Sequence, residues 1–69
     1  MEMSIQRKIG EEVARARRAA GMTQQGLARL SKTRQANISR LERGIQNPSV
    51  KFLERVAKSL GKKIRVKLD

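Results

Sequence analysis

The sequence predicts an all-α fold of four to five short helices, followed by one short C-terminal β-strand. Apolar residues recur at helical i, i+3 and i+4 spacing up to about residue 60, and beyond that point they alternate with cations. The chain has 69 residues, which is near the lower limit for a fold with one hydrophobic core. We therefore expect residues 1–69 to form a single domain and a second copy of the chain to supply further burial.

The first predicted helix covers residues 4–20 and ends at Gly21, a residue typical of helix C-termini. Its apolar stripe consists of Ile5, Ile9, Val13, Ala16 and Ala20. Arg15 and Arg18 point away from this stripe, whereas Arg17 lies on its edge. We expect the arginines at 15 and 18 to form a solvated face that adds only to the general positive field.

The second predicted helix is short and begins after Thr23, which is a good N-cap. It carries the apolar residues Leu27, Ala28 and Leu30. A turn over residues 31–33 leads into a third helix that ends at Gly44. Two short helices joined by a tight turn, here over about residues 24–43, form a helix-turn-helix.

The third predicted helix has two different sides. On a helix of 3.6 residues per turn, Ile38, Leu41 and Glu42 share one side. The other side carries Ala36, Ser39, Arg40 and Arg43. A side with cations and a methyl group, but without a large apolar residue, is suited to a negatively charged partner.

A loop, "IQNPS", separates this helix from a fourth one over about residues 50–60 that Ser49 caps. Its predicted core residues are Phe52, Leu53, Val56, Ala57 and Leu60. After Gly61, residues 63–68 alternate between apolar and cationic side chains, as in a half-buried strand. The strand residues Ile64, Val66 and Leu68 either pair with a second copy in a homodimer or pack on their own domain.

The composition favours a polyanionic partner. Seventeen Lys and Arg residues against six Asp and Glu residues give a net charge of +11. Nucleic acid is the first interpretation and an anionic membrane surface the second, although a single aromatic residue, Phe52, counts against membrane anchoring and base stacking. No apolar run approaches the roughly 20 residues of a membrane span, so we expect a cytoplasmic, nucleoid-associated protein without a membrane partner.

The same composition argues against catalysis and against cofactors. There is no cysteine and no histidine, which removes thiolate zinc ligands, the commonest metal ligand and the commonest general base. None of the six acidic residues lies in a catalytic or metal-binding motif. We therefore expect no enzyme activity, no metal and no cofactor.

The segment "MTQQGLARLSKTRQANISRLERGIQNPS" closely resembles the Xre-type helix-turn-helix domain of phage-repressor-like regulators. The matching features are Thr23-Gln24, Leu27-Ala28, the run from Ile38 to Glu42, Gly44 and Asn47-Pro48-Ser49. The tail is similar to that of a subset with a C-terminal strand, which includes antitoxins of toxin–antitoxin modules. The resemblance covers roughly residues 9–68 and implies a repressor-like DNA-binding domain.

Four residues are expected to read base edges, because side chains near the N-terminus of a helix in the major groove reach the bases. The amide of Gln35 can pair with adenine, the methyl group of Ala36 suits the thymine methyl, and Arg40 can fork onto guanine; Ser39 can donate or accept. By resemblance, these positions match the base-reading ones of the family. The alternatives are a helix-start role for Gln35 and a phosphate contact for Arg40.

Other polar residues are expected to contact phosphates. The candidates are Gln24, Lys32, Arg34, Asn37, Arg43, Asn47 and Lys51. Gln24 is included because free N–H groups at the start of a helix favour an anion. The alternatives are a solvated charge for Arg34 and a cap of the fourth helix for Asn47.

A carboxylate on the inner side of a helix needs a partner, because an isolated buried charge is costly. Arg17 is the expected partner of Glu42, and the resemblance implies a corresponding structural ion pair. The sequence departs from the family at Lys32, where glycine is usual and a lysine costs about 1 kcal/mol of strain. It also departs at Gly26, where glutamate usually completes the capping box, so the second helix should be the weakest element.

Two functions compete at this point. The first is a transcriptional regulator, expected to be a repressor that binds a palindromic operator of double-stranded DNA as a homodimer. The second is an antitoxin that binds a toxin protein and autorepresses its operon; the short chain leaves little room for a toxin-wrapping segment, whereas the C-terminal strand favours this function. A third, more distant function is sequence-blind binding to RNA or a membrane.

Overall fold

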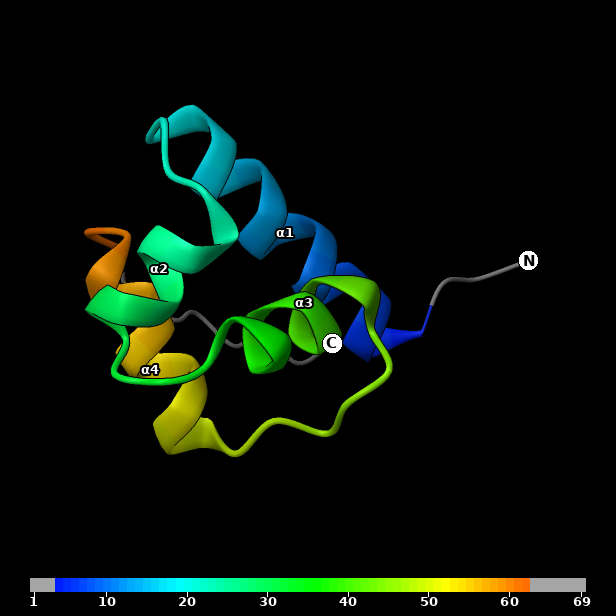
Figure 1. The fold of residues 1–69 in the computed structure, drawn as a ribbon. Helices are drawn as coiled ribbons and strands as arrows, with labels where there is room; N and C mark the ends of the chain where they lie inside the picture. Colours follow the sequence, from blue (N-terminus) through cyan, green and yellow to red (C-terminus); the bar gives the residue numbers. More distant parts are fainter. Residues whose placement is uncertain (1–3, 63–69) are drawn as a thin grey trace.

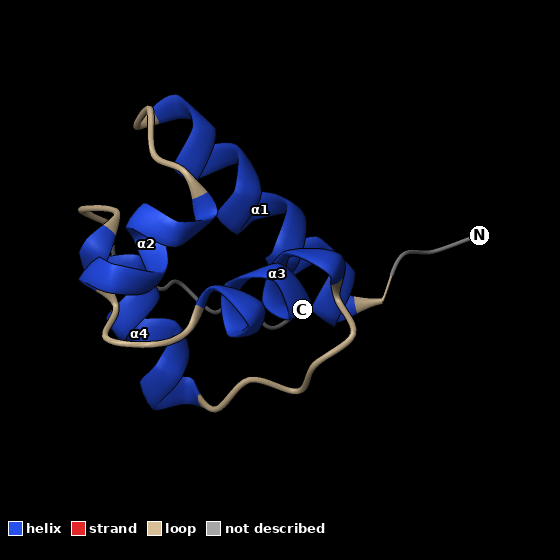
Figure 2. Ribbon diagram, viewed as in Figure 1, coloured by secondary structure: helices blue, strands red, loops and turns tan. Residues whose placement is uncertain are grey.

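Four helices build the part of the chain that the structure describes, residues 4–62 of a computed structural model (Figure 1). They are α1 (Ile5–Ala19), α2 (Gln24–Leu30), α3 (Gln35–Arg43) and α4 (Val50–Ser59). Within residues 4–62 all regular structure is helical, as Figure 2 shows, and no helix there is long and apolar enough to cross a membrane. The predicted all-α fold is confirmed for this part, while the predicted strand at 63–68 lies outside the described residues.

The helix boundaries follow the capping residues. The hydroxyl of Thr23 accepts a hydrogen bond from the Gly26 N–H at 2.9 Å, and that of Ser49 accepts one from the Phe52 N–H at 3.0 Å. At the other end of α3, Gly44 adopts the left-handed conformation with φ 72°. This turn lets the Ile45 N–H reach the Arg40 carbonyl at 3.2 Å. The predicted starts of α2 and α4 and the predicted end of α3 are confirmed.

The core lies between α2, α3 and α4. Its buried members are Leu27, Ala28, Ile38, Leu41 and Val56. Half-buried apolar side chains from α1, the α1–α2 turn, α4 and the C-cap of α4 surround them, namely Ile9, Val13, Met22, Phe52, Leu53 and Leu60. The helix-turn-helix of α2 and α3 is therefore held from both sides, by α1 and by α4.

The predicted apolar stripe of α1 is partly wrong. Ile5 is 72% exposed and Ala20 is also exposed, whereas Gly10 and Ala14 are the buried residues of this helix. A Cβ atom on Gly10 would lie 2.5 Å from the carbonyl oxygen of Glu42, so the backbones of α1 and α3 touch there. Close backbone contact needs small residues, and a pattern based on large apolar residues misses it. Leu30, a predicted apolar residue of α2, is likewise 58% exposed.

Candidate nucleic-acid interface

The two sides of α3 differ as the sequence predicted. Ile38 and Leu41 are 0% and 1% exposed, so they anchor the inner side of the helix. On the outer side, Gln35, Ala36 and Arg40 are exposed, and Arg43 follows them at the C-terminal end; Ser39 is half-buried. The structure therefore brings the four predicted base-reading residues together on one surface that the rest of residues 4–62 leaves open.

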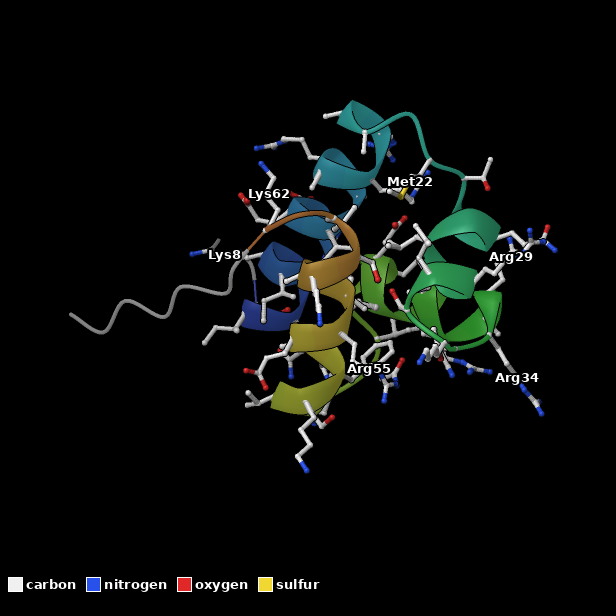
Figure 3. All side chains as sticks on the ribbon, turned by 90° about the vertical axis from the view of Figure 1, so that its left-hand side faces the viewer. Lys8, Met22, Arg29, Arg34, Arg55 and Lys62 are labelled. Carbon is white, nitrogen blue, oxygen red and sulfur yellow. The ribbon has the colours of Figure 1, made fainter. Side chains whose placement is uncertain are left out.

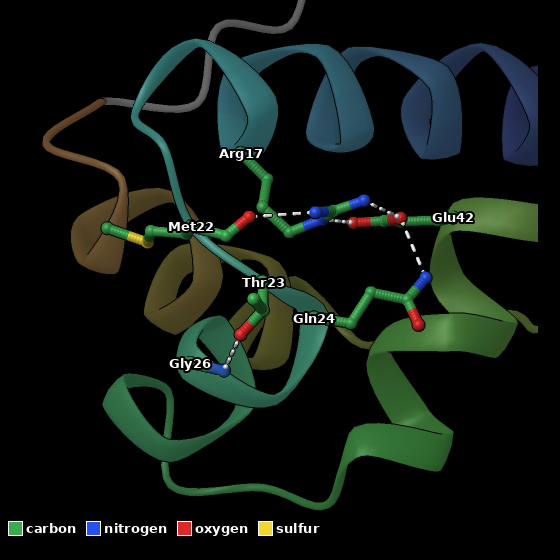
Figure 4. Close-up of polar contacts among 6 residues, drawn as sticks. All are labelled: Arg17, Met22, Thr23, Gln24, Gly26 and Glu42. Carbon is green, nitrogen blue, oxygen red and sulfur yellow. Dashed lines mark hydrogen bonds and ion pairs between the residues drawn. The ribbon is translucent and has the colours of Figure 1, made fainter.

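An ion pair beneath α3 connects it to α1 (Figure 4). Arg17 Nε lies 2.7 Å from Glu42 Oε2, and Arg17 Nη2 donates to Glu42 Oε1 at 3.1 Å. The two side chains are only 12% and 6% exposed. Arg17 Nη1 also donates to the Met22 carbonyl at 2.8 Å, so one guanidinium connects α1, the α1–α2 turn and α3. This bidentate geometry fixes the angle at which α3 leaves the core.

The same contacts favour the charged form of Arg17. The hydrogen bond to Glu42 and the negative charge of that carboxylate raise the pKa of Arg17 above its usual value, against the opposing effect of burial. A raised pKa in the folded state means that folding favours the charged form, and this contribution is lost only as the pH rises through the folded-state pKa. The arginine side of the interhelical contact is thus fully charged at neutral pH.

Gln24 joins this ion pair, which the sequence did not indicate. Its amide Nε2 donates to Glu42 Oε1 at 3.0 Å, and Figure 4 shows the side chain turned toward the carboxylate. Glu42 therefore accepts hydrogen bonds from two residues of different helices. The phosphate contact predicted for Gln24 stays a prediction, and one amide proton of Gln24 is already engaged.

A chain of hydrogen bonds runs along the outer side of α3. Arg40 Nη1 donates to Asn37 Oδ1 at 3.3 Å, and Asn37 Nδ2 donates to Thr33 Oγ1 at 2.9 Å. Asn37, predicted to contact a phosphate, thus lies between the turn and the guanidinium of Arg40. This arrangement connects the turn before α3 to Arg40 through the amide of Asn37.

The remaining predicted phosphate contacts lie on turns and helix starts around α3. Lys32, Arg34 and Lys51 are all exposed, and Figure 3 shows Arg34 projecting from the molecule on the same side as Arg29. Lys32 adopts φ 57°, the left-handed conformation that favours glycine. The side-chain oxygen of Asn47 accepts a hydrogen bond from the Gln6 amide, so Asn47 connects the α3–α4 loop to the start of α1 rather than capping α4.

Within residues 4–62 there is no group of three or more acidic, histidine or cysteine side chains that could hold a metal ion. The distinctive features are instead geometric: two helices joined by a tight turn, with the second one open on its outer side. The helix-turn-helix family profile matches residues 13–67 of the chain. The chain belongs to this helix-turn-helix family, a family of DNA-binding regulators of transcription.

This helix-turn-helix chain is similar to one relative in sequence and to solved structures in fold. It is 39% identical over 59 residues to the uncharacterized HTH-type transcriptional regulator y4dJ of Sinorhizobium fredii, covering 86% of this chain and 77% of the relative. The clp gene regulator ClgR of Corynebacterium glutamicum superposes with a TM-score of 0.89 at 28% identity, covering 93% of this chain and 82% of that one.

A third relative is a solved protein–DNA complex. The restriction-modification controller protein C.Esp1396I, a tetramer in complex with its natural 35-base-pair operator, superposes with a TM-score of 0.82 at 32% identity. The match covers 90% of this helix-turn-helix chain and 82% of the controller protein chain. The fold of residues 4–62 is thus one that this relative uses on duplex DNA.

Proposed function

We propose that this chain represses transcription by binding a palindromic DNA operator as a homodimer. In this proposal α3 of each copy enters the major groove, and the two helices occupy successive major grooves about 34 Å apart. One observation carries the proposal: α3 is anchored from below by Ile38, Leu41 and the Arg17–Glu42 ion pair, while its polar outer side stays open. A rigidly held helix with an open, cationic side has the shape and charge that a B-DNA major groove requires.

The outer side of α3 would read the sequence. Gln35 and Ala36 lie in its first turn, where side chains reach base edges, and Arg40 follows one turn later on the same side. A glutamine amide pairs with adenine, an alanine methyl contacts thymine, and an arginine forks onto guanine. Ser39, half-buried beside them, supplies a weaker hydrogen-bonding group.

Surrounding residues would position the protein on the backbone without reading sequence. The proposed phosphate contacts are Gln24, Lys32, Arg34, Asn37, Arg43, Asn47 and Lys51. Several of them are exposed on the turn before α3 or the loop and helix start after it. A helix in the groove would thus be flanked by cationic or amide side chains on both of its ends.

Residues 63–68 would supply the dimer contact, with Ile64, Val66 and Leu68 pairing with the same segment of a second copy. Two-fold pairing of identical chains places two identical reading helices on an inverted repeat. The assembly of C.Esp1396I on its operator supports an oligomeric DNA-binding form for this fold.

Selection of bound sequences from random duplexes tests the proposal. We expect the selected duplexes to contain an inverted repeat whose half-sites are centred about 10–10.5 base pairs apart. An Ala36→Asp variant, which introduces a negative charge at the exposed centre of the reading surface, serves as the control and should select nothing. If the duplexes selected by the native chain had no sequence motif in common, this would contradict the proposal and favour sequence-blind binding.

A second function, an antitoxin that holds a toxin protein and represses its own operon, depends on the same C-terminal segment. Purification of the full chain from its own host distinguishes the two. A stoichiometric protein partner would assign the antitoxin function, and a chain that is purified alone and still binds its selected operator would assign the free-standing repressor.

A further inference from the structure

A groove lies between α1, the start of α2 and the end of α3, on the side where the reading surface of α3 ends. It has a volume of about 410 Å³. Its lining residues are Glu11, Ala14, Arg15, Arg18, Gln24, Glu42 and Arg43. Three arginines from two helices therefore meet around this one concave surface, which we call the α1–α3 groove.

The carboxylate at the base of the α1–α3 groove does not cancel these cations. Glu42 is already paired with Arg17 and also accepts a hydrogen bond from Gln24. Glu11 is the other acidic residue of the lining, which also includes three arginines. The balance of charge at the groove surface is thus positive.

The arginines of the groove are largely available to a ligand. Among residues 4–62, the nearest carboxylate oxygen to Arg15 is that of Glu12 at 3.9 Å, and both side chains are about three-quarters exposed, so this surface pair contributes little. Arg18 and Arg43 make no ion pair with any residue in the stretch 4–62. Both side chains are exposed to solvent.

The α1–α3 groove continues the reading surface directly. Arg43 follows Arg40 by three residues, so it lies one turn further along the same side of α3. When α3 lies in a major groove, its ends approach the two sugar–phosphate backbones that border that groove. A polyanionic strand is therefore the partner that is brought to the arginines as soon as α3 docks.

We propose that the α1–α3 groove holds the DNA backbone beside the major groove, with Arg15 and Arg18 contacting phosphates next to the one bound by Arg43. This inference rests on the proposed function, and it replaces the expectation that these two arginines form only a solvated face. Helix α1 becomes part of the DNA-binding surface. The operator contact then extends beyond the bases that α3 reads.

The first test compares a double variant, Arg15→Gln with Arg18→Gln, with a control, Lys8→Gln with Lys62→Gln. Both variants lower the net charge by two, and Figure 3 shows Lys8 and Lys62 together on the side of the molecule opposite Arg34. For the groove variant, the slope of log affinity against log salt concentration should become shallower by about 1.8 per protomer, which is about 0.9 for each lost phosphate contact. The control should retain the native slope. Circular dichroism checks that both variants keep their helices.

The second test locates the contact on the DNA. Operator duplexes carry a single neutral methylphosphonate linkage at successive backbone positions. At some backbone positions outside the bases read by α3, we expect the neutral linkage to weaken DNA binding by the native chain but not by the groove variant.

The outcomes of the two tests are separable from those of the proposed function. If the groove variant and the control give the same slope and the same positional profile, the inference is overturned while sequence-specific binding by α3 stands. The inference would also be overturned if the groove variant bound DNA like the native chain but no longer bound an acidic protein that the native chain binds. Absence of duplex binding by the native chain would instead overturn the proposed function itself.

Discussion

In the proposed complex, Arg40 is the residue whose guanidinium is expected to read a base, by pairing with guanine. It is exposed on the outer side of α3, where its Nη1 donates a hydrogen bond to Asn37 Oδ1 at 3.3 Å. Replacing Arg40 by Ala should remove discrimination at one base position, worth about 1–3 kcal/mol for a bidentate contact to guanine. Affinity measurements on operators substituted at each position check this expectation.

Arg34→Ala is the matched comparison, since Arg34 is also an exposed arginine next to the start of α3. Loss of a phosphate contact should weaken binding to all sequences by a similar factor and leave the preference at every position intact. Should Arg40→Ala behave in the same uniform way, Arg40 contacts a phosphate and reads no base.

Lys32 combines a strained backbone with a proposed phosphate contact, and the two can be separated. At φ 57° a lysine is disfavoured and a glycine is not, so Lys32→Gly should raise the stability by about 0.5–1 kcal/mol and the melting temperature by several degrees. The same substitution removes a cation from the turn before α3, so it should lower the affinity for DNA. Thermal unfolding and a DNA titration of one variant measure both effects.

Lys32→Gln provides the control, because it keeps the strained side chain and removes only the charge. Its melting temperature should stay at the native value while its DNA affinity falls as far as that of Lys32→Gly. A glycine variant that is no more stable than the native chain would show that the left-handed turn is free of strain.

The contact between α1 and α3 is the packing feature on which the whole site depends. A methyl group at Gly10 would collide with the carbonyl oxygens of Leu41 and Glu42, both of which belong to the backbone of α3. Gly10→Ala should therefore push the two helices apart and destabilise the fold by about 1–3 kcal/mol or more. Because the same displacement stretches the Arg17–Glu42 ion pair, DNA binding should weaken with it.

Gly26→Ala is the comparison within α2, where a Cβ atom would meet only the hydroxyl oxygen of Thr23, at 3.2 Å. Chemical denaturation should place this variant within about 1 kcal/mol of the native chain, because alanine favours a helix more than glycine does. A Gly10→Ala chain as stable as Gly26→Ala would contradict the close approach of α1 and α3.

Local signals in the sequence were sufficient for the helices of residues 4–62 but not for the contacts between them. Thr23, Ser49 and Gly44 mark helix ends through their own backbone and side-chain chemistry, which is why these boundaries could be predicted. The burial of Gly10, in contrast, results from a backbone 31 residues further along the chain, and no periodicity of apolar residues reports it. The exposure of Ile5 is missed for the same reason, because the spacing of apolar residues does not show which part of α1 the other helices cover.

In the candidate site, too, features within one helix could be predicted from the sequence, whereas features between helices could not. Helical periodicity placed Ala36 and Arg40 on the side of α3 opposite Ile38, because all of them belong to one helix. The hydrogen bond from Gln24 to Glu42 joins two helices, and the α1–α3 groove joins three, so both depend on how the helices are packed. The contact between Arg17 and Glu42 joins two helices and could nevertheless be predicted. A carboxylate on the inner side of a helix needs a cation, and few cations lie close enough to an apolar stripe to be its partner.

At the scale of the whole molecule, the small core favours the proposed homodimer, whereas the charge opposes it in free solution. A chain of 69 residues with a net charge of +11 repels a second copy of itself, so apolar contacts must overcome this repulsion in a homodimer. Bound DNA neutralises part of the charge, and dimerisation and operator binding should therefore favour each other. We expect the dimer to be more stable on the operator than in free solution.

Removal of residues 63–69 tests the proposed dimer contact. Residues 4–62 contain all four helices, and the Lys62 N–H that closes the end of α4 on the Ala57 carbonyl at 2.8 Å is retained, so the shortened chain should keep its helical circular dichroism spectrum. We expect it to sediment as a monomer at concentrations where the full chain sediments as a dimer. Each shortened protomer should bind its half-site alone. On an operator with both half-sites, the slope of log affinity against log salt concentration should therefore fall toward the slope measured on a single half-site. A shortened chain that sediments as the full chain does would place the dimer contact on the helices instead.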